Sequence, residues 1–119
     1  MGWSKLGGTI PGEAADDKAG QSVSLSSDGT IIAVGAYGND GSASNSGHAS
    51  IFEYTNGNWS QLGGDINGEA AGDISGISVD LSSDGTIVAI GADYNDGGGT
   101  DSGHTRIYQY TDGDWSQLG

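Results

Sequence analysis

Alternating apolar and polar residues mark a short strand at two places, 56 residues apart. Ser22-Val23-Ser24-Leu25-Ser26 alternates strictly, and Ser78-Val79-Asp80-Leu81-Ser82 repeats the alternation. A period of two residues is typical of a half-buried β-strand. Asp-Gly pairs at 28–29 and 84–85 follow these segments, and such pairs tolerate the positive φ of a tight hairpin turn. Each segment therefore predicts the first strand of a β-hairpin.

The segment after each Asp-Gly pair is apolar on both faces, as in Thr30-Ile31-Ile32-Ala33-Val34. A strand of this kind is covered on both sides, which favours sheets stacked face to face. Later apolar segments and the turns between them predict two further strands per copy. The unit is then a four-stranded antiparallel meander, with its last two strands expected at 48–54 and 59–62, and at 104–110 and 115–118.

The chain is an internal repeat without gaps, because Trp3, Trp59 and Trp115 recur every 56 residues and 34 of 56 paired positions are identical. A period of this length indicates a β-propeller blade. We therefore predict an all-β fold with two propeller blades, a first repeat at 3–58 and a second at 59–114. Residues 115–119 begin a third repeat and add an extra outer strand.

Two blades do not close a propeller, because propellers typically contain four to eight. Identical chains joined head to tail form a ring when the rotation closes, so we expect a cyclic homo-oligomer. A tetramer with eight blades is favoured over a trimer with six, and an open filament or a strand-swapped dimer would also cover the apolar faces. The outer-strand segment occurs three times, at 3–7, 59–63 and 115–119. The surplus copy pairs in place of its twin, hangs free or reinforces closure.

The composition of the chain excludes several classes of binding partner. Sixteen acidic against three basic side chains give a formal charge of −13, which repels nucleic-acid phosphates. The chain has no apolar run long enough to insert into a membrane, and its first residues lack the basic and apolar regions of a secretory signal. Without cysteine there is no disulfide framework and no thiolate metal site. The 24 glycines fit a fold rich in turns.

Three motifs recur in both copies: a glycine before Ser-Val at 20–23 and 76–79, Gly-Ala at 35–36 and 91–92, and a glycine before an aromatic strand at 47–54 and 103–110. With these motifs the repeat resembles the FG-GAP family, the propeller repeat of integrin α-chain heads and of many bacterial surface proteins. The resemblance implies a secreted or cell-surface bacterial parent. The chain is then a natural excerpt from a longer array or an engineered reconstruction of one.

Calcium is the cofactor to consider, because integrin-like blades place spaced aspartates between their first two strands. Here that loop is only Ser26-Ser27-Asp28-Gly29-Thr30. Another loop offers oxygen ligands near alternate positions, as calcium loops do, but lacks a closing acidic residue. A connector with side-chain-to-backbone bonds is favoured there over a metal site, whose candidate ligands are Asp93, Asn95, Asp96 and Asp101.

His48 and His104 start equivalent strands and are ligand candidates, with a structural hydrogen bond favoured over metal binding. Trp59 and Trp115 open equivalent strands, where an indole stacks on a sugar ring or covers the core. Packing is favoured for them. Recurrent carboxylates suit loop capping better than acid–base chemistry; they are Glu13, Asp17, Glu69 and Asp73.

Taken together, these features predict a non-enzymatic propeller fragment that assembles with itself into a ring and serves as a structural or binding scaffold. No catalytic residue and no cofactor are predicted. The alternative function is a carbohydrate-binding, lectin-like module or a calcium-dependent adhesion module.

Overall fold

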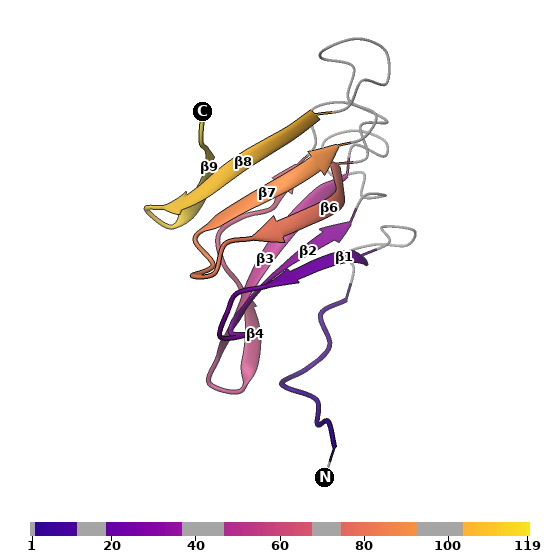
Figure 1. Cartoon of the computed structure of the whole chain (residues 1–119). Coiled ribbons are helices and arrows are strands. Elements are labelled where there is room, and N and C mark those ends of the chain that lie inside the picture. Colours follow the sequence, from indigo (N-terminus) through magenta and orange to yellow (C-terminus); the bar gives the residue numbers. More distant parts are fainter. Residues whose placement is uncertain (1, 12–18, 37–46, 68–74, 93–103) are drawn as a thin grey trace.

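The computed structural model describes residues 2–11, 19–36, 47–67, 75–92 and 104–119. In these residues the chain forms two antiparallel sheets and no helix. The first sheet has the order β1-β2-β3-β4, with strands β1 (Ala19–Leu25), β2 (Ile31–Ala36), β3 (His48–Thr55) and β4 (Asn58–Gln61). The second sheet repeats this order with β6 (Ser75–Leu81), β7 (Ile87–Ala92), β8 (His104–Thr111) and β9 (Asp114–Gln117) (Figure 1). The predicted all-β meanders are confirmed.

The hairpin turns explain why these strands pair with their neighbours in sequence. Between β3 and β4, Asn56 and Gly57 have φ values of 52° and 85°. Between β8 and β9, Asp112 and Gly113 have φ values of 53° and 88°. Two successive residues with positive φ give the turn whose twist matches that of the flanking strands, and Asn-Gly and Asp-Gly are the pairs that adopt it most readily.

Strands β1 and β6 begin earlier than the alternating pattern predicts. Each passes through a glycine with positive φ, 92° at Gly20 and 90° at Gly76, where the register with the next strand shifts. Across this shift β1 and β6 each advance by three residues while the partner strand advances by one, and an irregularity of this kind breaks the period of two. The alternation in the sequence is therefore interrupted before Ser22 and Ser78, although both strands continue to Ala19 and Ser75.

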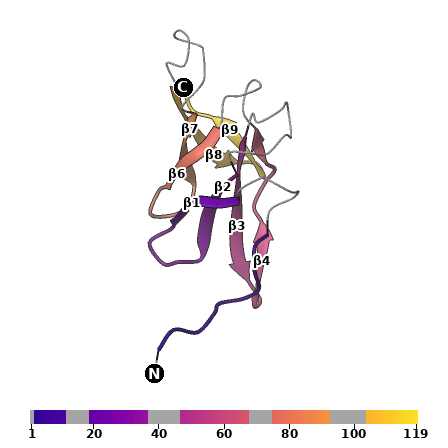
Figure 2. The same ribbon diagram turned by 90° about the vertical axis from the view of Figure 1, so that its right-hand side faces the viewer.

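Residues 3–7, the first of the three outer-strand segments, form no strand in the described chain. Leu6 and Gly7 lie against Trp59 of the first sheet, and from there the chain leaves the sheets toward its N-terminal end (Figures 1 and 2). A strand requires a partner, and the equivalent segment β4 has β3 beside it. A short strand that the sequence did not suggest, β5 (Ile66–Asn67), pairs instead with β3 beyond the end of β4.

The two sheets stack face to face (Figure 2). The core lies between them, because Ala33, Ala49 and Ile51 of the first sheet pack against side chains of the second sheet. The buried residues on the second sheet are Leu81, Val88, Ile90 and Trp115, and Ile66 of the connecting segment joins them. Burial of an aliphatic side chain of this size contributes about 1.5–3 kcal/mol. The stacking therefore holds the two repeats together as one unit.

The backbones approach most closely beside β1 and β6. The Ser22 hydroxyl donates a 2.8 Å hydrogen bond to the carbonyl oxygen of Gly76, and the Ser27 amide donates a 2.8 Å bond to the carbonyl oxygen of Ser83. Ser27 and Ser83 are equivalent positions of the two repeats. The Ser24 hydroxyl accepts a 3.0 Å bond from the Leu81 amide. These bonds fix the relative position of the sheets at this edge.

Candidate functional site

The main candidate surface is the pair of outer sheet faces, which the described residues cover only in part. In an antiparallel sheet, directly paired residues lie on the same face. Val23 pairs with Val34 and Leu25 with Ile32, so these side chains share the outer face of the first sheet. Ala33 pairs with Ile51 on the opposite face, which packs on the second sheet. In the second sheet the roles are exchanged, and Ala89 and Ile107 lie on its outer face.

Three pairs of equivalent residues in the two repeats differ in exposure. Leu25 is 55% exposed, whereas its equivalent Leu81 is 7% exposed against the first sheet. On the other side, Ile51 is fully buried, whereas its equivalent Ile107 is only partly buried. Leu118 is 49% exposed, whereas Leu62 is partly buried. Each outer face thus carries the equivalents of residues that are buried in the interface between the two sheets of the chain.

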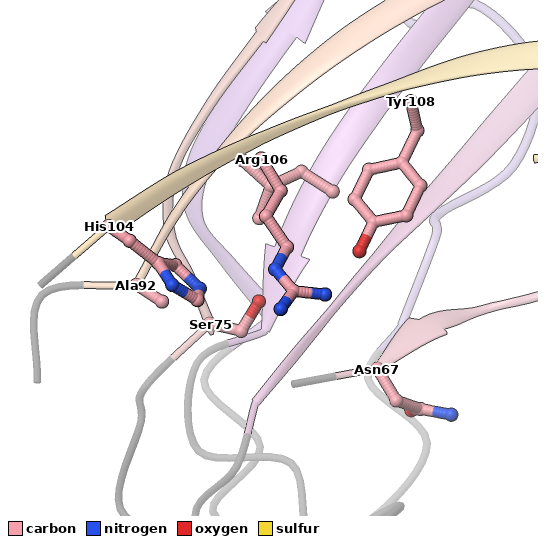
Figure 3. A pocket seen from close by; sticks show the side chains of 7 residues that line it. Asn67, Ser75, Ala92, His104, Arg106 and Tyr108 are labelled. Atoms are coloured by element: carbon pink, nitrogen blue, oxygen red, sulfur yellow. The ribbon is translucent and has the colours of Figure 1, made fainter. Parts of the chain in front are cut away.

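A small hollow occurs at the same place in both repeats. Beside the first sheet it is lined by Ile10, Pro11, Ala19, Val34, Ala36, His48, Ser50 and Phe52. Beside the second sheet it is lined by Asn67, Ser75, Ile90, Ala92, His104, Arg106 and Tyr108 (Figure 3). The latter has space for about one water molecule. Neither hollow has the size of a typical small-molecule pocket.

The second hollow differs from the first in charge, because Arg106 stands where the first repeat has Ser50. In Figure 3 the Arg106 guanidinium and the Tyr108 hydroxyl point into the same space as Ser75. Arg106 Nη1 also donates a 3.2 Å hydrogen bond to Gln117 Oε1 on β9. This bond joins β8 to its neighbour β9 in the second sheet.

His48 and Asp65 belong to a polar cluster on the first sheet. His48 is 3% exposed, and its Nδ1 lies 3.7 Å from Asp65 Oδ2, which is beyond hydrogen-bond range. Asp65 Oδ1 accepts a 2.9 Å bond from the Ser50 hydroxyl and a 2.6 Å bond from Gln61 Nε2. The cluster fastens the segment after β4 onto β3. His104 is less buried than His48, and each histidine belongs to its own sheet.

Both candidate tryptophans pack against a tyrosine of their own sheet with the two rings tilted, and both donate a hydrogen bond to a backbone carbonyl. Trp115 Nε1 lies 2.8 Å from the carbonyl oxygen of Leu62, and its ring centroid is 5.2 Å from that of Tyr110. Trp59 Nε1 lies 2.9 Å from the carbonyl oxygen of Leu6, and its ring is 5.3 Å from that of Tyr54. The indoles therefore join neighbouring segments of the repeat.

Sequence reasoning missed the partners of these indoles. The Leu-Gly pairs at 6–7, 62–63 and 118–119 follow each tryptophan at the same spacing, which was the available signal. Gly7 and Gly63 have φ values of 72° and 74°, and a Cβ on either would lie 2.8–3.0 Å from Cδ1 of the tryptophan one repeat later. Glycine lets the backbone pass this close to the indole ring.

The candidate metal ligands Asp93, Asn95, Asp96 and Asp101 lie outside the described residues, as do the loop carboxylates Glu13, Asp17, Glu69 and Asp73. Within the described ranges, no three His, Asp or Glu side chains gather at one point. In the turn between β1 and β2, bonds from the Thr30 hydroxyl, the Thr30 amide and the Ser26 hydroxyl lower the pKa of Asp28. The Asp84 turn repeats this arrangement. These carboxylates stabilise hairpin turns.

The family comparison agrees with the repeat geometry. Residues 10–52 match the model of a family described as FG-GAP repeat. The chain carries an FG-GAP repeat. This match spans β1, β2 and most of β3, and the second copy has the same strand order and the same turns. FG-GAP repeats form β-propeller-like structural and binding modules. A search of the curated proteins finds no match to the chain. No helix in the described part has the length and apolar character needed to cross a membrane.

Proposed function

We propose that the chain is a non-enzymatic scaffold whose two sheets are propeller blades, and that copies of the chain join head to tail into a closed ring. The observation that carries the proposal is the contrast between Leu25 and Leu81. Leu81 is buried because the first sheet covers it, and Leu25 has the same place in its own sheet without a cover. A second copy that places its second sheet on this face supplies the missing cover.

The two outer faces are complementary because the chain already contains their interface. The face with Val23 and Leu25 corresponds to the second-sheet face that packs inside the chain, and the face with Ala89 and Ile107 corresponds to the first-sheet partner. Repeating the internal packing between copies requires no new kind of contact. Such a head-to-tail contact closes when the rotation per copy divides a full turn. We favour four chains with eight blades, followed by three chains with six.

The role as a scaffold rests on the FG-GAP repeat, whose members typically serve as structural or binding modules. The expected partner is another copy of the chain, with neither nucleic acid nor a membrane-inserted segment. The parent protein of such a repeat belongs at a bacterial cell surface or outside the cell. The curved assembly would present its turns on the rims, where loops of different sequence are tolerated.

The proposal is tested by light scattering coupled to size-exclusion chromatography over a range of concentrations. The native chain is expected to elute with the mass of four chains, or of three. Leu25→Glu places a charge on the outer face of the first sheet and should give a folded monomer. Thr55→Glu is the matched control, because Thr55 is exposed at the end of β3 beside the hairpin turn. A native chain that remains monomeric at all concentrations contradicts the proposal.

A further inference from the structure

The N-terminal segment occupies part of the outer face of the first sheet, which is the docking face for a second copy. Leu6 accepts the Trp59 indole hydrogen bond at 2.9 Å, as Leu62 accepts that of Trp115 at 2.8 Å. Gly7 lies against Trp59 as Gly63 lies against Trp115. Residues 6–7 thus take the same position against the first sheet that residues 62–63 take against the second.

A docking copy brings a third version of this segment to the same place. If the internal interface is repeated, Leu118 and Gly119 of the docking copy reach Trp59. Leu118 is held in its own sheet as Leu62 is, since the amides of both donate 2.7 Å bonds to the isoleucine carbonyl of the neighbouring strand. Gly119 has a φ of 83°, close to that of Gly7. An indole has one N–H and no acceptor, so Trp59 accommodates one of the two segments.

Within the described chain, the C-terminal segment is the better anchored of the two. Strand β9 pairs with β8 through a two-residue turn, and Gln117 accepts a hydrogen bond from Arg106. Residues 2–6 pair with no strand, and Trp3 is fully exposed. If the N-terminal segment replaced β9, Lys5 would stand in the place of Gln117 and face Arg106. Two cations that face each other across paired strands repel, so replacement of β9 by the N-terminal segment is disfavoured.

We propose that residues 2–8 form a cap on the Trp59 end of the docking face, and that this cap leaves Trp59 when Leu118 and Gly119 of a second copy bind there. The proposal rests on the self-association argued above. The occupant is a named segment of a second copy, and the cap competes with it for one indole N–H. The native chain therefore associates more weakly than its apolar faces alone would allow.

Glycine substitutions in equivalent positions test the cap. A valine at Gly7 would push its Cβ against Trp59 Cδ1 and Nε1, and its φ of 72° is strained for valine, so Gly7→Val releases the cap. Gly8→Val is the matched control, because a Cβ at Gly8 meets nothing within 4 Å. Gly119→Val puts the same obstacle on the incoming segment. The association constant is measured for each chain by sedimentation equilibrium, with circular dichroism as the check on folding.

Gly7→Val is expected to associate about tenfold more tightly than the native chain, roughly the effect of one hydrogen bond and its packing. Gly8→Val should match the native chain, and Gly119→Val should associate about tenfold more weakly. A chain that begins at Thr9 should behave as Gly7→Val does, which guards against a local folding defect of that variant.

Weaker association of Gly7→Val with an unchanged Gly119→Val would overturn the cap, because it would mean that residues 2–8 bridge the copies in place of β9. Equal association of all the chains would also overturn it. In both cases self-association itself stands. If neither the native chain nor Gly7→Val associates, the proposed function fails and the cap fails with it.

Discussion

Gly35 lies directly against Gly76, whose carbonyl oxygen occupies the space that a Cβ at position 35 would need. Gly91 is the equivalent of Gly35 on the second sheet, and the nearest atom to its added Cβ is Oγ of Ser78 in its own sheet. A hydroxyl can rotate away, whereas a backbone carbonyl inside an interface cannot. The same residue type is therefore under different constraints in the two repeats.

Gly35→Ala is expected to lower the free energy of unfolding by about 1–3 kcal/mol, because the sheets must separate to admit the methyl group. Gly91→Ala should cost less in the dilute monomer. Urea denaturation of both variants at low protein concentration measures the difference. Equal losses would mean that Gly35 is not a contact point between the sheets. At high concentration Gly91→Ala should weaken self-association, since it faces the docking copy.

Truncation of equivalent leucines should have unequal effects. Leu81→Ala removes a side chain buried between the sheets and is expected to cost about 2–4 kcal/mol in unfolding free energy. Leu25→Ala removes a side chain that is 55% exposed and should cost less than about 1 kcal/mol in the dilute monomer. Thermal unfolding followed by circular dichroism measures both. If both variants lose stability alike, Leu25 is already covered by another part of the chain.

The strands could be predicted from sequence because their signals are local. Alternation at Ser22–Ser26 and the Asp28-Gly29 pair each act over a few residues. The sequence left open whether residues 3–7 pair or hang free, because pairing depends on a neighbour, and the sequence of Trp3 and Leu6 is the same whether or not that neighbour is present. The indole bond between Trp115 and Leu62 spans a full repeat, so no local pattern predicted it.

The candidate site was also predictable only where it depends on local sequence signals. The repeat predicted that two faces would need covers, because the second strand of each hairpin is apolar on both sides. It did not predict that Leu6 and Gly7 would occupy part of one face, since that contact depends on the path of the chain before β1. The metal candidates from Asp93 to Asp101 remain a sequence prediction.

Acid should loosen the contact between the sheets at Asp114. Bonds from the Gly64 and Trp115 amides lower the pKa of Asp114 below the ordinary value of 3.8. A carboxyl group with a lowered pKa in the folded state stabilises the fold above its unfolded pKa, and this contribution is lost as the pH falls through the folded pKa. Stability should therefore decline as the pH drops below about 3.8.

Asp114→Asn provides the control, because the amide oxygen still accepts the Gly64 hydrogen bond but does not titrate. Asparagine is also the natural residue at the equivalent position, Asn58. Urea denaturation from pH 7 to pH 2.5 should show a shallower acid decline for Asp114→Asn than for the native chain. Identical slopes would remove Asp114 from the acid response.

Salt should strengthen self-association. Each copy carries a formal charge of −13, so copies repel one another at low ionic strength. The Debye length falls from about 30 Å at 0.01 M to about 10 Å at 0.1 M salt, which screens this repulsion. Sedimentation equilibrium at the two salt concentrations should show tighter association at the higher one. Weaker association in salt would point to attractive ion pairs between the copies instead of apolar faces.

The hydrogen bond from the Ser27 amide to the Ser83 carbonyl links equivalent positions of the two repeats. It joins a residue to its own counterpart one period later, so the relation can be applied again to generate every further sheet. In a row that stops, one terminal carbonyl and one terminal amide have only water as a partner. In a closed ring of sheets, every sheet donates one such hydrogen bond to one neighbour and accepts one from the other. The same rule yields a fibre if each step also rises along the axis, and that rise therefore decides between an object of fixed size and one without an end.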